Sequence, residues 1–365
     1  MTPSQVKVSL EKLQDTVHLQ GEWCDLYGRS DQSSVFLTWD WLSSWIEQYS
    51  PFLDLHVLRC YVEHQLVGLA VVSRERVRRR KLFRRTLLVV NSSTYSDCDV
   101  TIEHNGLLVE TGLDAEVYAT LFRWVQTQAV GVDELYFPNA IPAVSREIYS
   151  PWLVVEDREY FVANLRHLVA SSAEYLQSLS ANTRSQLRAA MRKYEKDFGE
   201  LTLTEAGTLD EALDYFSHLK VLHQSRWQAK GKPGAFADSR WEAFHRSLIE
   251  RRFSEKGVQI CRVVAGTHIV GYVYSLIHQG SVFMIQSGLN YLANQKFKPG
   301  YVCHCRVIEH NKLLGMDRYD FLIGDNQYKR SLSHAILKDN DVWYRKASFS
   351  QWIENRLVWL RGICR

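Results

Sequence analysis

Apolar residues in the first half of the chain change between helical and strand spacing. A helix is expected over 39–49, because large apolar residues recur there at intervals of three and four: Trp41, Leu42, Trp45, Ile46 and Tyr49. Runs rich in β-branched and apolar residues predict strands at 55–62, 66–72, 86–90 and 100–109. A helix over 115–130, a strand over 134–137 and a short helix over 143–149 follow.

The same order of elements recurs after about Tyr160. The patterns predict a strand at 201–205, helices at 209–230 and 241–252, and strands at 258–265, 269–277 and 282–289. They then predict a helix at 301–314, a strand at 318–322, a largely helical segment at 326–338 and a last strand at 342–346. The repeat lies in the pattern and not in the residues, and it predicts a duplicated fold.

Length and composition are those of a chain with two ordinary domains. The chain has 365 residues, of which 46% are hydrophobic. We expect domains at 1–158 and 159–346 and an amphipathic helix at 347–365. That last helix has two readings, one in which it packs against the second domain and one in which it lies on a membrane.

Charge and cysteine content limit the classes of partner and the cellular compartment that we expect for this chain. With 44 Lys and Arg against 41 Asp and Glu, the net charge of +3 does not indicate a general nucleic-acid binder, so an anionic partner must meet a local patch. The sequence shows no secretory signal and no membrane span. Its seven cysteines do not form a disulfide framework in so large a chain, so we expect a cytoplasmic protein that is either free or peripheral at the inner membrane.

Three stretches of the second half carry a family resemblance. The first runs from His223 to Asp238, the second joins Gly288-Leu-Asn-Tyr to Lys298-Pro299-Gly300, and the third runs from Tyr319 to Lys329 as a strand that ends Asp-Phe-Leu-x-Gly and leads to Tyr-Lys. Together they resemble the CelD/BcsL-type acetyltransferases of the GNAT superfamily, which are associated with cellulose and capsule biosynthesis. That family is similar in turn to the Fem peptidyltransferases, which use aminoacyl-tRNA on a doubled fold.

The resemblance implies an α/β (α+β) fold of tandem GNAT-like domains, with mixed, mostly antiparallel sheets flanked by helices. The first domain would be degenerate and the second catalytic, with acetyl-CoA or another acyl-CoA as co-substrate and no metal. A GNAT protein holds the CoA pyrophosphate at a Gly-rich helix start, where backbone N–H groups and the helix dipole favour phosphate. Here that segment has one glycine and two lysines, and its candidate donor-binding residues are Lys296, Lys298, Gly300, Tyr301 and Val302.

Candidate catalytic residues lie around the strand at 318–322. Lys329 follows the strand end, where it would stabilise the oxyanion that forms on an attacked thioester, and Tyr328 would protonate the leaving thiolate. Asp320 is a charge within an apolar run and would need a partner such as Lys329 or His223. The alternative is a surface lysine after a packed tyrosine.

The expected acceptor side lies on the helix at 209–230. His223 would act as the base, and Arg226 lies three residues further on the same face. Arg226, Trp227 and Asp325 are the candidate substrate-binding residues. The other readings are a structural histidine and an Asp325 that caps the next helix. The Gly/Pro loop at 231–238 is either a lid or a plain connection.

Two basic segments could meet an anionic partner. Arg74–Arg85 holds eight cations in twelve residues on an expected hairpin, which would bind an anionic membrane or tRNA, or remain solvated. A second stripe recurs every four residues on one helix: Arg184, Arg188, Arg192 and Lys196. In a Fem-like enzyme such a helix would face tRNA; the alternative is the polar face of a packed helix.

A zinc site at Cys303, Cys305 and His310 is not expected, because residues two apart on a helix point roughly 200° from each other. The favoured function is an acyl-CoA-dependent N- or O-acyltransferase acting on a sugar, lipid-linked sugar or amino-group acceptor. The alternatives are a Fem-like aminoacyl-tRNA-dependent transferase and a non-catalytic GNAT-fold module in polysaccharide synthesis.

Overall fold

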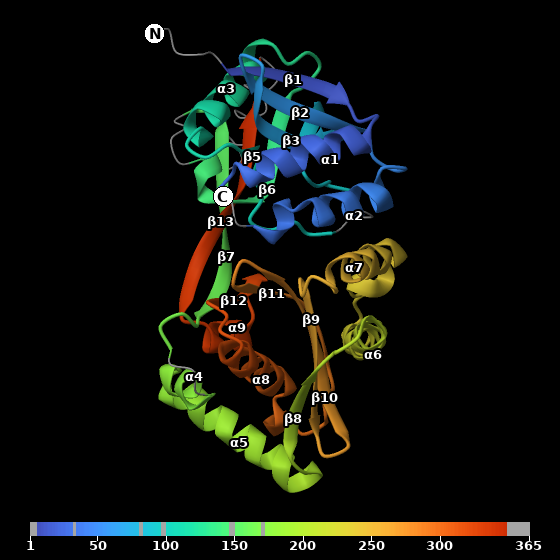
Figure 1. Cartoon of the computed structure of the whole chain (residues 1–365), viewed down its shortest axis with the longest axis vertical. Coiled ribbons are helices and arrows are strands. Elements are labelled where there is room, and N and C mark those ends of the chain that lie inside the picture. Colours follow the sequence, from blue (N-terminus) through green and yellow to red (C-terminus); the bar gives the residue numbers. More distant parts are fainter. Residues whose placement is uncertain are drawn as a thin grey trace, which may run out of the picture. The chain divides into compact units, whose positions relative to one another are not determined.

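The computed structural model describes residues 6–31, 34–79, 83–95, 100–145, 150–168 and 172–348. These residues divide into two compact units. The first consists of the described residues up to Arg158 and from Lys338 onward, and the second is Glu159–Leu337. The fold class is mixed α/β, with a mostly antiparallel sheet flanked by helices in each unit (Figure 1).

The sheet of the first unit has the strand order β1-β2-β3-β4-β6-β13. Only the β4·β6 pair is parallel. A two-residue strand, β5, pairs with β3. The bounds are β1 (Val6–Lys12), β2 (Leu55–Val62), β3 (Gln65–Arg79), β4 (Phe83–Val90), β5 (Leu108–Val109), β6 (Glu134–Ala140) and β13 (Ala335–Arg345).

Helices cover both faces of this sheet. On one face lie α1 (Thr16–Gly28) and α2 (Trp39–Tyr49), which bury Trp23, Trp41 and Trp45, and on the other lies α3 (Asp114–Thr127) (Figure 1). Two short 3-10 helices add to the unit, η1 (Val35–Leu37) and η3 (Pro142–Val144). Each helix buries one stripe of apolar residues, as expected for helices on a sheet.

The second unit repeats this plan with the strand order β8-β9-β10-β11-β12-β7. Only the β11·β12 pair is parallel. The bounds are β7 (Leu153–Asn164), β8 (Leu201–Glu205), β9 (Val258–Ala265), β10 (His268–His278), β11 (Ser281–Leu289) and β12 (Arg318–Ile323).

Strand alternation divides the core of the second unit. Tyr272 and Tyr274 contact the aromatic rings of α6, while Val273 belongs to the core beneath α5 and α8 (Figure 1). The helices are α4 (Ser172–Ser178), α5 (Ala181–Phe198), α6 (Leu209–Gln228), α7 (Ser239–Arg252), α8 (Pro299–Leu313) and α9 (Gln327–Leu332), with 3-10 turns η4 (Ala235–Ala237) and η5 (Gln295–Phe297).

One strand of each unit is out of sequence order. β7 follows β6 along the chain but pairs with β12, and β13 follows β12 but pairs with β6. The residues of β7 that pair with β12, Tyr160–Asn164, belong to the second unit, whereas the residues of β13 that pair with β6, Asn340–Arg345, come after the second unit in the sequence and belong to the first. The segment 338–346, which we expected in the second domain, accordingly lies with the first unit.

The predicted strands and helices agree with the structure in the meander 258–289 and in the helix over 39–49. The strand over 100–109 was wrong, since within this segment only Leu108–Val109 forms a strand, and Asn105 makes an isolated bridge to Ala140. The helical segment over 326–338 was also wrong beyond Leu332, because the backbone becomes extended at Ser333 and the His334 N–H donates to the Val162 carbonyl. The strands β1 and β7 and the helix α1 were missed. The expected helix over 347–365 lies outside the described residues from 349 onward. The expected helix over 143–149 lies outside them over 146–149.

No helix among the described residues is long and apolar enough to span a membrane.

Candidate functional site

The two parallel strands of the second unit part after a short ladder. β11 pairs with β12 only from Ser281–Arg318 to Phe283–Asp320. Opposite β10, the register passes from Met284 to Gln286, which leaves Ile285 as an extra residue that bends β11 where the ladder ends. β12 has its own irregularity against β7 between Asp320 and Ile323. The parting of the strands is thus built into both.

Asp320 and Lys329 hold the bend in β12. Leu322 has φ 61°, a left-handed conformation that costs a residue with a Cβ about 1–2 kcal/mol. Its N–H donates to Asp320 Oδ1 at 2.8 Å, and its carbonyl accepts from Lys329 Nζ at 3.2 Å. Lys329 Nζ also donates to the Ile323 carbonyl at 2.7 Å. Both side chains are buried, so they fix an otherwise unfavourable backbone.

A partner of Asp320 that the sequence reasoning missed is Arg318, whose guanidinium forms an ion pair with Asp320 Oδ2. The two residues lie two apart on the same strand and therefore on the same face. Because Asp320 is fully buried, this ion pair and the Leu322 N–H account for the charge within the apolar strand.

Tyr328 lies in the first turn of α9. Its ring stacks on His304 of α8 with centroids 4.8 Å apart and the planes parallel within 1°. Burial raises the pKa of Tyr328, and the nearby Tyr291 raises it further. Burial, together with the Lys329 charge, lowers the pKa of His304 to about 3, so this imidazole is neutral. A neutral ring thus positions a protonated phenol.

The start of α8 has the features of an anion site. Lys298 adopts a left-handed conformation before Pro299, and no acidic residue lies in the first turn. The N–H groups of Gly300 and Tyr301 precede the first internal hydrogen bonds of the helix, whereas the Val302 N–H already donates to the Lys298 carbonyl. The Val302 N–H is therefore already used within the helix, and Val302 remains a candidate donor-binding residue through its other atoms.

The two lysines at this helix start differ. Lys298 Nζ donates to Gln186 Oε1 at 2.6 Å and lies 5.2 Å from the Tyr301 ring centroid, so it is directed along α8. Lys296 is exposed. The Tyr301 hydroxyl lies 3.0 Å from Ser331 Oγ and connects α8 to α9.

Arg226 lies near the end of α6, with its guanidinium 4.1 Å from the Tyr291 ring centroid. Tyr291 follows β11 and is the tyrosine of the stretch Gly288-Leu-Asn-Tyr; it was given no role in the sequence analysis. Trp227 takes another direction, with Lys230 and Lys232 over its ring at 5.3 and 5.6 Å.

His223 is buried between α6, β11 and the following loop. Its Nδ1 lies 3.4 Å from the Ser287 carbonyl, and its Nε2 accepts from the Ala235 N–H at 3.3 Å. The hydrogen therefore lies on Nδ1, and burial lowers the pKa of the ring. The Nε2 lone pair, which a general base would need, already accepts the Ala235 N–H of the loop 229–238. This hydrogen bond and the one from Nδ1 to the Ser287 carbonyl are both long.

Asp325 is exposed and its carboxylate accepts from Arg330 Nε at 2.6 Å. This contact lowers the pKa of Asp325. The N-cap of α9 is Asn326, so Asp325 does not cap the helix. The structure thus gathers Asp320, Tyr328, Lys329 and Arg226 around the ends of β11 and β12, and directs Asp325 outward to Arg330.

The two basic segments lie on the elements that the sequence predicted, a hairpin and a helix. In the β3–β4 hairpin, Arg76, Arg78 and Arg84 are exposed, while Arg79 pairs with the buried Glu134. Arg80 and Lys81 lie outside the described residues. On α5, Arg188, Arg192 and Lys196 are exposed opposite the buried Leu187 and Tyr194, and Arg184 caps carbonyls of the preceding turn.

Comparison with known proteins supports the fold of the second unit. Residues 181–330 match a family model described as an acetyltransferase (GNAT) domain. No curated protein matches the chain. The matched range contains every candidate site residue named above.

Solved structures share the doubled architecture. The crystal structure of FemX matches at a TM-score of 0.56 and 9% identity, covering 92% of this chain and 97% of that one. A conserved protein from Bacteroides thetaiotaomicron matches at 0.56 and 9%, covering 93% and 100%. The C-terminal domain of a protein named as a lysylphosphatidylglycerol synthetase from Agrobacterium fabrum matches at 0.54 and 8%, covering 94% and 95%. At these identities the likeness is one of fold.

Proposed function

We propose that the second unit transfers an acyl group from an acyl-CoA to an amine or hydroxyl acceptor. The observation that carries this proposal is the parting of β11 and β12 beside the start of α8, with Tyr328 near the point where they part. The GNAT domain match over residues 181–330 supports a transferase of this class.

The donor would lie along β11 and end at α8. Beyond Phe283, the edge of β11 that faces β12 has no ladder partner among the described residues. The Ser287 N–H donates to Gln286 Oε1 and its carbonyl lies 3.4 Å from His223 Nδ1, so these two groups would exchange those partners to pair with an extended amide chain such as the pantetheine arm. The pyrophosphate would then meet the N–H groups of Gly300 and Tyr301 and the charges of Lys296 and Lys298.

The reaction would form a bond from the acceptor nitrogen or oxygen to the acyl carbon and break the C–S bond. Tyr328 would give its proton to the departing thiolate; its raised pKa keeps the phenol protonated at neutral pH, as an acid requires. His223 would take the acceptor proton once the Ala235 N–H releases its Nε2. Lys329 and Asp320 would act by holding the bend that places Tyr328, in place of the oxyanion role expected for Lys329.

We expect no comparable donor site among the described residues of the first unit. Its β4·β6 ladder is also three residue pairs long, but the helix that follows, α3, begins with Asp114 and Glu116 in its first turn. These carboxylates would repel a pyrophosphate from that helix start. We therefore propose one donor site per chain, in the second unit.

The acceptor side would be formed by Arg226 and Trp227 near the end of α6, with the loop 229–238 beside them. The resemblance to CelD/BcsL-type proteins supports a sugar, lipid-linked sugar or amino-group acceptor in exopolysaccharide or cell-envelope biosynthesis. On this proposal the protein acts in the cytoplasm or at the inner membrane surface.

A second candidate is transfer from aminoacyl-tRNA. Three exposed cations on α5 favour it, since Arg188, Arg192 and Lys196 follow one face of a long helix and could contact a phosphate backbone. The fold shared with FemX agrees with it.

Isothermal titration of the purified protein with acetyl-CoA, longer acyl-CoAs and tRNA separates these candidates. We expect one acyl-CoA per chain and at least tenfold weaker binding by a Lys296→Ala/Lys298→Ala variant. Lys7→Ala, an exposed lysine in the first unit, serves as the matched charge control. Binding of tRNA alone would favour the second candidate, and binding of neither would leave a non-catalytic GNAT-fold module.

A further inference from the structure

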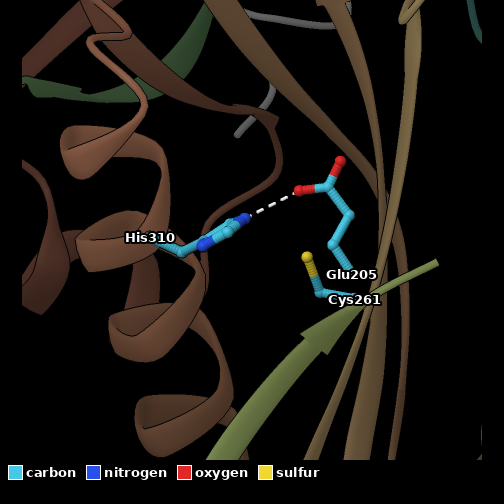
Figure 2. Close-up of side chains that lie close together, drawn as sticks. All are labelled: Glu205, Cys261 and His310. Carbon is cyan, nitrogen blue, oxygen red and sulfur yellow. Dashed lines mark hydrogen bonds and ion pairs between the residues drawn. The ribbon is translucent and has the colours of Figure 1, made fainter. Parts of the chain in front are cut away.

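Three potential metal ligands meet on the face of the second sheet that α8 covers. Glu205 ends β8, Cys261 lies directly opposite it on β9, and His310 comes from the last turns of α8 (Figure 2). The carboxylate oxygen, the thiol sulfur and the imidazole nitrogen all lie within 4.8 Å of one another. His310 Nε2 is 2.7 Å from Glu205 Oε2.

A buried amide pair fixes the carboxylate from behind. Gln259 Nε2 donates to Glu205 Oε2 at 3.0 Å, and Gln259 is in turn bonded to Asn311 by contacts of 2.7 and 3.2 Å. Gln259 and Asn311 are both buried. An oriented carboxylate of this kind is what metal sites use to hold their ligands in place.

We propose that Glu205, Cys261 and His310 bind a zinc ion. A thiolate, an imidazole and a carboxylate form a donor set that suits zinc, which prefers four ligands in a tetrahedron. The side chains of His310 and Glu205 keep 27% and 36% of their surface exposed, so the fourth position would face solvent and take water. This site does not depend on the proposed transfer reaction and departs from our expectation that the chain holds no metal.

Binding requires a small rearrangement of the three donors. Zinc bonds of about 2.0–2.3 Å place neighbouring donor atoms roughly 3.3–3.8 Å apart in a tetrahedron. His310 Nε2 and Glu205 Oε2, at 2.7 Å, would move apart to admit the ion, and all three donor atoms already lie within 4.8 Å of one another. Cys261 would lose its proton to solvent, since the thiolate is the ligand.

The ion would attach the end of α8 to the β8–β9 edge of the sheet. Because the start of the same helix carries the candidate anion site, a metal at Cys261 and His310 would fix the axis of α8 at its opposite end. Its role on this proposal is structural.

Cobalt titration of chelator-treated full-length protein tests the site. We expect one Co²⁺ per chain, with the visible bands of tetrahedral cobalt and a near-ultraviolet thiolate-to-cobalt charge-transfer band, all removed by Zn²⁺. Cys261→Ala should abolish the charge-transfer band. Cys303→Ala, which removes another buried thiol from α8, should retain it.

Glu205→Gln and His310→Gln alter partly exposed side chains, so they remain informative if Cys261→Ala fails to fold. Each should weaken zinc binding at least tenfold in competition with a chromophoric chelator. The proposal is overturned if wild-type protein gives no thiolate band, if the band persists in Cys261→Ala, or if both glutamine variants bind zinc as the wild type does. The three side chains would then form an ordinary ion pair beside a buried thiol.

Discussion

Leu322 is the residue on which the candidate site depends locally. Its left-handed conformation turns the chain out of β12, and the two groups that hold it are a buried carboxylate and a buried ammonium. Asp320 and Lys329 are both buried, whereas a group that reacts with a substrate would have to be accessible to it. Their charges are used to hold a bend, and the bend places the turn that carries Tyr328.

Lys329→Met should therefore destabilise the protein. Methionine keeps most of the apolar stem but leaves the Leu322 and Ile323 carbonyls without their ammonium donor, which should cost about 2–4 kcal/mol of unfolding free energy. Urea denaturation measures the change. If stability stayed at the wild-type value while turnover disappeared, the lysine would act in the chemistry and its role at the bend would be minor.

Tyr328→Phe should separate chemistry from folding. The ring contact with His304 is kept, so unfolding free energy should change by less than about 1 kcal/mol, while loss of the acid should lower kcat by about 10²–10⁴-fold. Turnover with acetyl-CoA and thermal unfolding are the measurements.

Tyr175→Phe is the matched control, because it removes a buried phenol that donates to the Leu332 carbonyl at the end of α9 and is not a candidate site residue. It should retain near-normal turnover. Equal losses of kcat in both variants would mean that Tyr328 serves packing between α8 and α9.

At the scale of elements, the bends in β11 and β12 explain what the sequence could and could not reveal. Apolar runs separated by turn residues predicted the three strands of 258–289. An extra residue such as Ile285 leaves no mark in a continuous apolar run, and Leu322 is an unlikely residue for a left-handed turn. The family resemblance included Tyr291, Tyr328 and Lys329, but nothing in the sequence indicated that His304 would stack on Tyr328.

The hairpin β3–β4 offers a prediction about anionic partners. Changing the exposed Arg76, Arg78 and Arg84 to Ser should weaken binding to anionic vesicles or tRNA and lower the salt dependence, by up to about 3 units of slope for nucleic acid. Binding measured across a salt series gives both quantities.

Arg79→Ser is a suitable contrast within the same hairpin. Arg79 pairs with the fully buried Glu134, so its loss should reduce stability more than partner binding. Unchanged partner binding in the triple variant would show that the exposed cations are only solvated.

At the scale of the whole molecule, two buried histidines make the second unit sensitive to acid. Burial lowers the pKa of His245 to about 3, and burial with the Lys329 charge does the same for His304. The unfolded chain, with an ordinary histidine pKa near 6.5, binds protons that the folded chain does not. The contribution of these two neutral histidines to the free energy of unfolding is fully present above pH ~6.5. It falls as the pH drops toward 3, by about 1.4 kcal/mol per pH unit for each histidine.

Urea unfolding between pH 7 and 5 tests this prediction. A His304→Phe variant, which keeps a ring against Tyr328, should show a slope smaller by about one histidine's share. A slope identical to that of the wild type would mean that the imidazole becomes protonated within the folded protein.

The pairing of β13 shows why the end of the second domain was not predictable from the sequence. Sequence order assigns β13 to the second half, whereas its pairing with β6 assigns residues 340–345 to the sheet of the first unit. A pattern of residues carries no record of which sheet edge a strand joins. The duplicated order of elements, in contrast, follows from periodicity alone.

Hydrogen exchange with and without acetyl-CoA tests the central claim most directly. The account predicts slower exchange at residues 284–289 and at Gly300 and Tyr301 when the donor binds, with no change at the start of α3 around Asp114 and Glu116. Protection at the start of α3, or an unchanged pattern in 284–301 at saturating acetyl-CoA, would contradict it.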